Sequence, residues 1–397
     1  LTGGMGVGMR RNRIIFGILW ILSLVGISFF GGAVSYGFFA MLTLVFLVSL
    51  LYVVMVHIFF RIYQELEENE PVAGQMVPFY FVLKNEYFFG FAGIRARFFT
   101  DYSHIAGLDD EAEYELLPRT GIEKRTELVC KYRGNYEVGI RSVEMQDYFR
   151  LFTISFRNKE TLRVEVKPKI VHLEELSSVD ISYIMARDSA SRLSDPDVLV
   201  RKYEAGDDIR QIHWKTSARS GELMVRKRIG EEQDGIRILL ETSRTDPAPE
   251  EYLPVENKML EAALSLALFF AKKSIPMRMY FHGKGEEKVC ERAVSMHSFG
   301  TLYEELSHVE FREETPEELF LETVSHVHDF FQSKMVFLIL HRWSEETDRL
   351  FLQMQENNVY TVVFLVSGNE EDDALPVQAK NGKVIRISPD AELAEVM

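Results

Sequence analysis

The residues with the clearest potential for chemistry are concentrated between Tyr203 and Lys227, in the sequence YEAGDDIRQIHWKTSARSGELMVRK. Gly206 permits a left-handed turn, and Asp207 or Asp208 can cap a short helix by accepting hydrogen bonds from its free amide groups. Cations follow closely, and Gly221 then turns the chain into GELMVRKRI, a predicted strand. The segment combines carboxylates, guanidinium groups and a tryptophan within one short stretch.

Two interpretations of this segment stay open. In the structural one, local cations pair with the aspartates, and Ile209, Ile212 and Trp214 pack inward beside the capped helix. In the functional one, the segment is a docking surface for a protein partner or an acidic ligand. The candidate residues under either interpretation are Tyr203, Gly206, Asp207, Arg210, Trp214, Lys215, Ala218 and Arg219.

Other chemistry is poorly supported. His326 and His328 are two residues apart on a predicted helix and face different sides, whereas a helical metal pair needs a spacing of four. Cys130 and Cys290 fit no metal or disulfide spacing. No phosphate-binding glycine loop and no Cys/His or Ser/His pair can be identified. The sequence therefore predicts no catalytic residues and a protein that is not an enzyme.

The N-terminal region predicts a membrane hairpin. From Ile14 to Phe60 there is no Lys, Arg, Asp or Glu. Ile14–Phe30 and Phe38–Phe60 are each near the roughly 20 apolar residues that a helical span requires, and a short Gly-rich turn joins them. The alternative is a cleaved signal peptide followed by one helix, but no small-residue cleavage site precedes a hydrophilic start. We expect contact with the lipid bilayer through residues 14–60.

Flanking cations set the expected orientation. Arg10, Arg11 and Arg13 precede the first span, Arg61 follows the second, and the turn between the spans carries no charge. The positive-inside rule then places both ends, and the soluble body, in the cytoplasm. Two cysteines in 397 residues suit a reducing compartment. A net charge of −15 argues against nucleic-acid binding. We predict a two-pass protein of the cell membrane.

Length predicts two to three domains, and periodicity divides the chain. Residues 1–62 form the hairpin. An acidic stretch, Glu65 to Glu70, ends at Pro71 and predicts a solvated helix end or linker. Residues 72–168 contain short alternating strands separated by turn residues, which is typical of an antiparallel β-sandwich. Residues 169–234 read as a linker that carries the Tyr203–Lys227 segment.

Residues 235–397 alternate between apolar strands and amphipathic helices. This pattern predicts a doubly wound α/β domain, a mostly parallel sheet covered by helices on both faces. Its expected strands are 235–241, 276–282, 288–294, 335–341, 359–366 and 383–388. Its expected helices are 256–274, 298–307, 315–332 and 344–358, the last opened by a Ser344 cap.

The order Tyr203, Gly206-Asp207, Arg210, Ile212, Trp214-Lys215, Ala218-Arg219 and Gly221 resembles the signature of the bacterial family catalogued as domain of unknown function 58. Arg133-Gly134-x-Tyr136 and Asp147-Tyr148-Phe149-Arg150-Leu151-Phe152 resemble that family's Arg-Gly-x-Tyr and Asp-Pro-Phe-Gly-Leu-Phe elements. Here Tyr148 replaces the proline and Arg150 replaces the glycine. The layout of hairpin, β region, motif and α/β domain is similar over nearly the whole chain.

The resemblance implies a von Willebrand factor A-like C-terminal domain, which often binds a divalent metal through an Asp-x-Ser-x-Ser loop. The matching positions are Glu241, Ser243 and Thr245. Glu241 is longer than aspartate and would crowd a small octahedral ion such as Mg²⁺. His341-Arg342 stands where the family would offer Ser-Asp. We therefore predict a degenerate metal site, with Mg²⁺ the ion it would take if it binds one, and no cofactor.

Together these observations lead to one expected function and two alternatives. The expectation is a membrane-anchored, non-enzymatic adaptor or scaffold. The resemblance implies its partners, a MoxR-type AAA+ ATPase and a transglutaminase-like membrane protein. The alternatives are a divalent-metal-dependent ligand-binding domain and an unrecognised enzyme of envelope metabolism.

Overall fold

The computed structural model describes residues 3–108, 112–176, 198–202, 212–228, 236–244, 248–282, 288–293, 295–311, 330–331, 333–367 and 382–396. The chain forms two compact units, Leu1–Lys167 and Pro168–Met397. The predicted helix 315–332, with His326 and His328, lies outside the described residues apart from Phe330 and Phe331.

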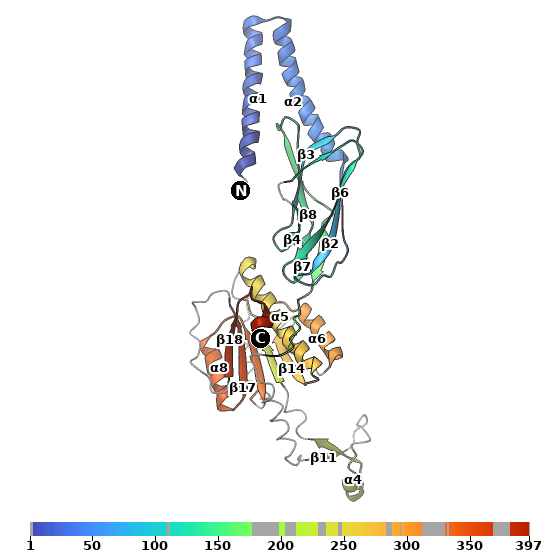
Figure 1. The fold of residues 1–397 in the computed structure, drawn as a ribbon, viewed down its shortest axis with the longest axis vertical. Helices are drawn as coiled ribbons and strands as arrows, with labels where there is room; N and C mark the ends of the chain where they lie inside the picture. The colour runs from blue at the N-terminus through green and yellow to red at the C-terminus, as the bar shows by residue number, and fades with distance from the viewer. Residues whose placement is uncertain are drawn as a thin grey trace. The chain divides into compact units, whose positions relative to one another are not determined.

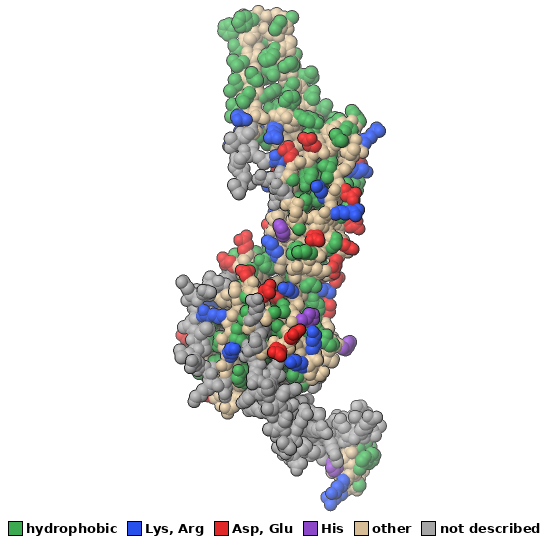
Figure 2. Space-filling view, in the orientation of Figure 1, with side chains coloured by type: hydrophobic (Ala, Val, Ile, Leu, Met, Phe, Trp, Pro, Cys, Tyr) green, Lys and Arg blue, Asp and Glu red, His purple; other side chains and the backbone are tan. Residues whose placement is uncertain are grey.

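The first unit begins with two long apolar helices, α1 (Gly3–Phe30) and α2 (Ala33–Phe59), which lie side by side. Met9–Phe30 and Ala33–Phe59 are each long and apolar enough to cross a membrane. Hydrophobic side chains cover their exposed surface (Figure 2), and only 6% and 22% of the most apolar windows of the two helices are buried. The indole of Trp20 donates to the Thr43 hydroxyl at 3.2 Å and joins the two helices.

The connection between the helices is shorter than predicted. Gly31 and Gly32 alone separate them, with φ of 55° and 99°. Residues 33–37, predicted as part of the turn, are helical, because two consecutive glycines in left-handed conformations already reverse the chain.

Antiparallel strands make up the rest of this unit. One sheet has the order β1-β2-β6-β4, a second has the order β5-β3-β8-β9, and β10 pairs with β7. The strands are β1 (Phe60–Leu66), β2 (Met76–Asn85), β3 (Phe91–Phe98), β4 (Ser103–Ile105), β5 (Glu113–Leu116), β6 (Gly121–Cys130), β7 (Gly134–Val138), β8 (Ile140–Gln146), β9 (Thr153–Arg157) and β10 (Leu162–Val166). Inward side chains from both sheets share one hydrophobic core, as the period-2 alternation predicts.

The junction between hairpin and sheets corrects one prediction. The sequence predicts that the hairpin extends to residue 62 and that Glu65 to Glu70 form a solvated helix end or linker. Instead β1 starts at Phe60, directly after α2, and pairs with β2 from Phe60↔Asn85 to Leu66↔Phe79. Alternate side chains of β1 are exposed, Glu65 among them, and Glu67, Glu68 and Glu70 follow the end of the strand. The second helix therefore continues into a paired strand without a flexible segment.

The second unit contains a six-stranded sheet of order β15-β14-β13-β16-β17-β18, in which only the edge pair β14–β15 is antiparallel. Its strands are β13 (Ile236–Leu240), β14 (Met277–His282), β15 (Lys288–Ala293), β16 (Met335–Leu340), β17 (Tyr360–Val366) and β18 (Gly382–Ile387). Its helices are α5 (Pro249–Lys272), α6 (Met296–Ser307), α8 (Glu345–Glu356) and α9 (Leu393–Val396). The predicted parallel sheet flanked by helices is confirmed.

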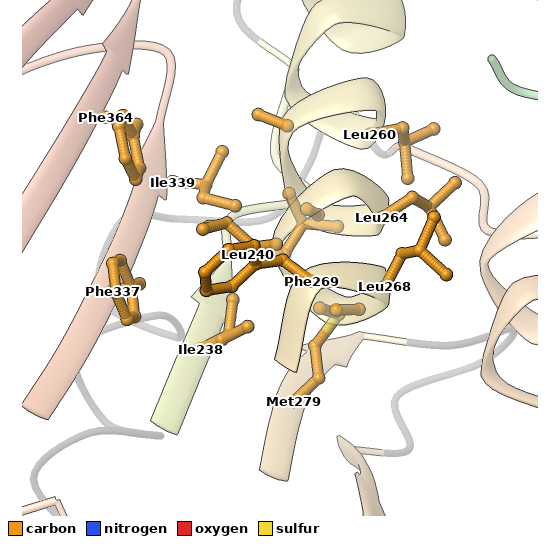
Figure 3. Close-up of a cluster of buried hydrophobic side chains, with 14 of the residues drawn as sticks. Ile238, Leu240, Leu260, Leu264, Leu268, Phe269, Met279, Phe337, Ile339 and Phe364 are labelled. Atoms are coloured by element: carbon orange, nitrogen blue, oxygen red, sulfur yellow. The ribbon is translucent and has the colours of Figure 1, made fainter. Parts of the chain in front are cut away.

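Two hydrophobic clusters lie on the two faces of this sheet. Ile238 and Leu240 belong to the cluster under α5, and Leu239 between them belongs to the cluster under α8. Figure 3 shows part of the first cluster, where Phe269 of α5 lies next to Ile238 and Leu240 of β13. Ser344 caps α8 by accepting the amide of Thr347 at 3.1 Å, which confirms that prediction.

Two details differ from the expected elements. Helix α5 begins at Pro249, earlier than the expected Glu256, because a proline suits the first turn of a helix and Pro254 is accommodated within it. Residues 168–176, at the start of the predicted linker, contact the second unit's core: Leu173 and Leu176 are buried, and the amide of Val171 donates to Ser265 Oγ at 3.0 Å.

Candidate functional site

The described part of the central segment is a helix between paired strands. Strand β11 (Val198–Lys202) pairs with β12 (Met224–Arg228), and α4 (Trp214–Ser220) precedes β12. The predicted strand after Gly221 is confirmed. Tyr203, Gly206, Asp207 and Arg210 lie outside the described residues.

Helix α4 is held by contacts at both ends. The His213 ring accepts the Thr216 amide at 3.1 Å and caps the helix, so the cap of α4 is His213. Gly221 ends the helix in the left-handed conformation with φ 73°. The Ser217 hydroxyl donates to the His213 carbonyl at 3.1 Å and accepts the Met224 amide at 2.8 Å. These contacts fix α4 against the start of β12.

The exposed face of α4 carries the four described candidate residues. Trp214 and Ala218 are four residues apart, as are Lys215 and Arg219, so each pair shares a side of the helix. All four residues are exposed. The inward packing predicted for Ile212 is confirmed, whereas that for Trp214 is wrong, since 66% of its surface is accessible. Ser217 takes the buried helix position instead.

Neither Lys215 nor Arg219 forms an ion pair with another described residue. An exposed indole beside two cations is the composition found at the centre of protein-binding surfaces, where tryptophan and arginine contribute most of the energy. Such a face would complement a partner surface that is both apolar and acidic.

The predicted metal position lies at a topological switch point. Strands β13 and β16 are neighbours, and the chain leaves them toward opposite edges of the sheet. Ligands of doubly wound domains bind at the carboxyl ends of such strands. Glu241 follows β13 and His341 follows β16, so the two side chains meet at this edge.

The Glu241 carboxylate is already satisfied by protein groups. One oxygen accepts the Ser243 hydroxyl at 2.7 Å, and the other lies 3.0 Å from His341 Nδ1 and 3.2 Å from the His341 amide. Glu241 is 5% exposed and Ser243 is 8% exposed. In the sequence, His341 stands out only as part of the pair that replaces the family's Ser-Asp. Its place directly after an apolar parallel strand is the signal that could have located it.

Arg244 points away from this carboxylate. It forms a two-pronged ion pair with Glu256 on α5, and its guanidinium carbon lies 3.7 Å from the centre of the Tyr252 ring. The cavity beside Ser243, Arg244 and His341 has a volume of about 10 Å³. This is near the lower limit for one water molecule.

These donors do not fit the metal that the resemblance implies. A magnesium site requires about six oxygen ligands in octahedral geometry. Here the described groups offer one carboxylate, that of Glu241, and its oxygens already contact the Ser243 hydroxyl and the His341 imidazole. Thr245 lies outside the described residues. Within the described ranges, no group of three or more His, Cys, Asp or Glu side chains is arranged to hold an ion.

We expect Mg²⁺ to leave the thermal stability of the protein unchanged. A ligand that binds only the folded state raises the melting temperature, and at 100 times its dissociation constant it contributes about 2.7 kcal/mol. Differential scanning fluorimetry with and without Mg²⁺, with Na⁺ at equal ionic strength as the control, measures this. A rise specific to Mg²⁺ that Glu241→Gln abolishes would contradict the absence of fit.

The second family-like element forms a tight turn in the first unit. Asp147 is 3% exposed, and its Oδ1 accepts the amides of Leu151 and Phe152, each at 2.7 Å. Its Oδ2 accepts the Phe149 amide at 3.1 Å. A carboxylate with three amide donors is a strong charge-assisted arrangement.

This turn also contacts the helical hairpin. Asn12 Nδ2 donates to the Phe149 carbonyl at 3.2 Å, and Arg13 Nε donates to the Leu151 carbonyl at 2.7 Å. The Phe152 ring lies 5.1 Å from that of Phe46 on α2. The sequence singled out this element by resemblance, and the structure assigns it a positioning role between hairpin and sheets.

Arg150 carries backbone strain at the position where the family has glycine. Its φ is 54°, which costs a residue with a Cβ about 1–2 kcal/mol. We expect Arg150→Gly to raise the free energy of unfolding of this unit by about 0.5–1 kcal/mol. Arg150→Ala is the matched control, since both substitutions remove the ion pair to Glu113 at 3.5 Å but alanine keeps the strain. Equal stability of the two variants in chemical denaturation would refute the strain.

Comparison with known proteins supports the family resemblance for part of the chain. The family described as "Protein of unknown function DUF58" matches residues 199–301, which include α4 and the Glu241 loop. A search of curated proteins found no match. Among solved structures, a GH20 exo β-N-acetylglucosaminidase from Vibrio harveyi is similar at 8% identity, over 78% of this chain and 57% of that chain. Its TM-score of 0.15 is too low to carry an argument about fold or function.

Proposed function

We propose that this chain is a membrane-anchored, non-enzymatic adaptor whose soluble body binds a protein partner in the cytoplasm. The observation that carries the proposal is the exposed face of α4, where Trp214 is accessible and lies beside Lys215 and Arg219. This face lies within the segment that matches the family. At the switch point, the side chains of Glu241, Ser243 and His341 contact one another, so their polar atoms are already used. The exposed face of α4 is therefore the stronger candidate for binding a partner.

The anchor in this proposal is the α1–α2 hairpin, crossing the cell membrane twice. Arg13 lies at the sheet end of α1 and Arg61 follows α2, and cations at these places favour a cytoplasmic body. Fusions to the C-terminus test the orientation. We expect a green fluorescent protein fusion to be fluorescent and an alkaline phosphatase fusion to be inactive; the reverse pattern would place the body outside the cytoplasm.

We further infer that residues 235–397 form a von Willebrand factor A-like domain that has lost its metal chemistry. Numbering the strands from β13, the sheet has the order 3-2-1-4-5-6, the doubly wound arrangement, with the third strand antiparallel at the edge. An experimental structure with another strand order would refute this inference.

The partner we propose is a MoxR-type AAA+ ATPase, and a transglutaminase-like membrane protein is the second partner that the resemblance implies. The chemistry of α4 favours a partner surface with apolar and acidic groups, because the indole needs desolvation and the two cations need complementary charge.

Affinity capture from membranes tests this proposal. The full-length protein is purified in mild detergent from its native membranes without nucleotide, with ADP and with a non-hydrolysable ATP analogue. We expect an AAA+ ATPase to be retained in at least one state. Retention of no such ATPase in any state would overturn the partner assignment.

Matched variants locate the surface. Trp214→Ala with Arg219→Ala should reduce capture at least tenfold, since loss of central tryptophan and arginine contacts each costs about 2 kcal/mol or more. Arg349→Ala with Leu352→Ala removes a similar exposed pair from α8 and should leave capture unchanged. Equal loss in both variants would refute a specific role for α4.

A further inference from the structure

An open pocket lies where α2 passes into β1. Its volume is about 750 Å³. His57 belongs to the last turn of α2, Phe60 and Arg61 to the start of β1, and Phe156 and Arg157 to β9. The full lining is His57, Phe60, Arg61, Ile62, Glu137, Phe156, Arg157, Asn158, Lys159, Glu160 and Thr161. The function proposed above does not use this pocket.

The pocket has an apolar wall. The Phe156 ring lies 4.7 Å from the His57 ring and 6.5 Å from the Phe60 ring, edge to face in both cases. Phe60 is 4% exposed and Phe156 is partly buried. These contacts join the sheet to the end of the apolar helix, so the wall is continuous with the span.

The polar side of the pocket carries more positive than negative charge. The lining contains three cations, Arg61, Arg157 and Lys159, and two carboxylates, Glu137 and Glu160. The whole chain, by contrast, has a net charge of −15. The lining of this pocket therefore carries one positive charge in excess, on a chain that is acidic as a whole.

One of the carboxylates is already neutralised. Glu137 accepts the Thr161 hydroxyl at 3.0 Å and the Arg157 guanidinium at 2.9 Å. These two contacts hold the pKa of Glu137 below its usual value, so it stays ionised and paired. Arg61 and Lys159 are then the cations that the lining offers to a ligand, and Arg61 also lies 3.9 Å from Glu86 Oε2, where both side chains are exposed. Arg61 donates to the Ile58 and Phe60 carbonyls at 3.1 and 3.3 Å, which keeps it at the end of α2.

We propose that this pocket binds the phosphate-bearing headgroup of an anionic phospholipid from the leaflet that faces the soluble body. The proposal rests on the membrane anchorage proposed above. Arg61 and Lys159 contact the phosphate, and the Phe60 and Phe156 wall contacts the glycerol and the first methylenes of the acyl chain. Cationic pockets at the level where helices leave the bilayer bind anionic headgroups in this way.

A lipid fits better than a free phosphate ester for two reasons. The wall offers apolar surface that a small soluble anion would leave exposed to water. Ile58, which follows the pocket residue His57 in α2, is 53% exposed on the apolar helix, so an acyl chain can continue along α2 into the bilayer. The lipid would fix the angle between span and sheet at a junction that has no linker.

Native mass spectrometry of the full-length protein tests the proposal. The probes are phosphatidylglycerol, phosphatidylcholine and glycerol 3-phosphate, each added to the detergent-solubilised protein. We expect one phosphatidylglycerol to be retained in preference to phosphatidylcholine, and glycerol 3-phosphate not to displace it. Equal retention of the two lipids, or full displacement by the soluble ester, would overturn the assignment.

The variant Arg61→Ala with Lys159→Ala should weaken phosphatidylglycerol binding roughly 25-fold, because each of the two cations near a lipid surface contributes about a fivefold change. Lys124→Ala with Lys131→Ala removes two exposed cations that do not line the pocket and is the matched control. An Arg61/Lys159 variant that retains the lipid like the wild type would refute the site.

Extraction of membranes with alkaline carbonate separates this proposal from the anchor. If the protein resists extraction but shows no preference for phosphatidylglycerol, the pocket assignment fails and the anchor stands. If carbonate releases the protein, the anchor fails, and with it the basis of the lipid assignment. We expect resistance to extraction for the wild type and for both pairs of variants.

Discussion

Asp147→Ala is expected to lower the free energy of unfolding of the first unit by about 3 kcal/mol, because three backbone amides lose their buried side-chain acceptor. The loss should also loosen the hairpin, since Asn12 and Arg13 contact carbonyls of the same turn. The substitution therefore tests whether the turn positions the sheets against the helices.

Thiol reactivity measures this effect in the first unit alone. Cys130 is fully buried in the core of that unit, and Cys290 is the chain's other cysteine. In a Cys290→Ser background, Asp147→Ala should raise the labelling rate of Cys130 on the order of 100-fold through easier opening.

Two controls bracket the Asp147 result. Asp147→Asn keeps one acceptor oxygen and should show an intermediate rate. Asp101→Ala removes an exposed carboxylate, 3.4 Å from Arg141, and should change the free energy of unfolding by less than about 0.5 kcal/mol. A rate for Asp147→Ala that equals the Asp101→Ala rate would contradict the role assigned to the turn.

Glu241→Ala is expected to destabilise the second unit by about 3 kcal/mol. The substitution removes the hydrogen-bond acceptor of Ser243 and the partner of His341 at a buried position. Removing one member of a buried polar pair lowers the free energy of unfolding strongly, because the remaining group stays buried without its partner. Glu241→Gln keeps the size and an acceptor oxygen, so we expect a loss of about 1 kcal/mol.

A double-mutant cycle separates pairing from general damage. The combined variant Glu241→Ala with His341→Ala should be more stable than the sum of the two single effects predicts, because the two side chains interact directly. Trp343, whose ring lies 5.8 Å from that of Phe351, reports unfolding of this unit by fluorescence when Trp20 and Trp214 are replaced by phenylalanine. Strict additivity would show that Glu241 and His341 are not coupled.

The elements with strong periodicity were predictable from the sequence. The apolar run Met335–Leu340 lies in the sheet centre, because strands covered on both faces need no polar residues. Strand β1 was not predictable, since its exposed side favours charged residues and its partner β2 is distant in the chain. Whether a segment forms a paired strand depends on contacts with residues distant in the sequence, and the local composition does not predict those contacts.

The candidate site was predictable only in part. The four described residues of α4 lie on one exposed face, as a docking surface requires, but Trp214 was expected inside. Apolar character alone favoured burial, whereas the small Ser217 takes the inward position through hydrogen bonds to His213 and Met224. The Glu241–His341 contact joins residues 100 positions apart and depends on which strands are neighbours.

Site-specific photocrosslinking in living cells tests directly whether α4 engages a protein partner. A photoreactive phenylalanine derivative is placed at position 214, and at position 352 as the control, since Leu352 is 50% exposed on α8. We expect a crosslink from position 214 to an AAA+ ATPase and none from position 352. No crosslink from position 214, or equal crosslinking from both positions, would contradict it.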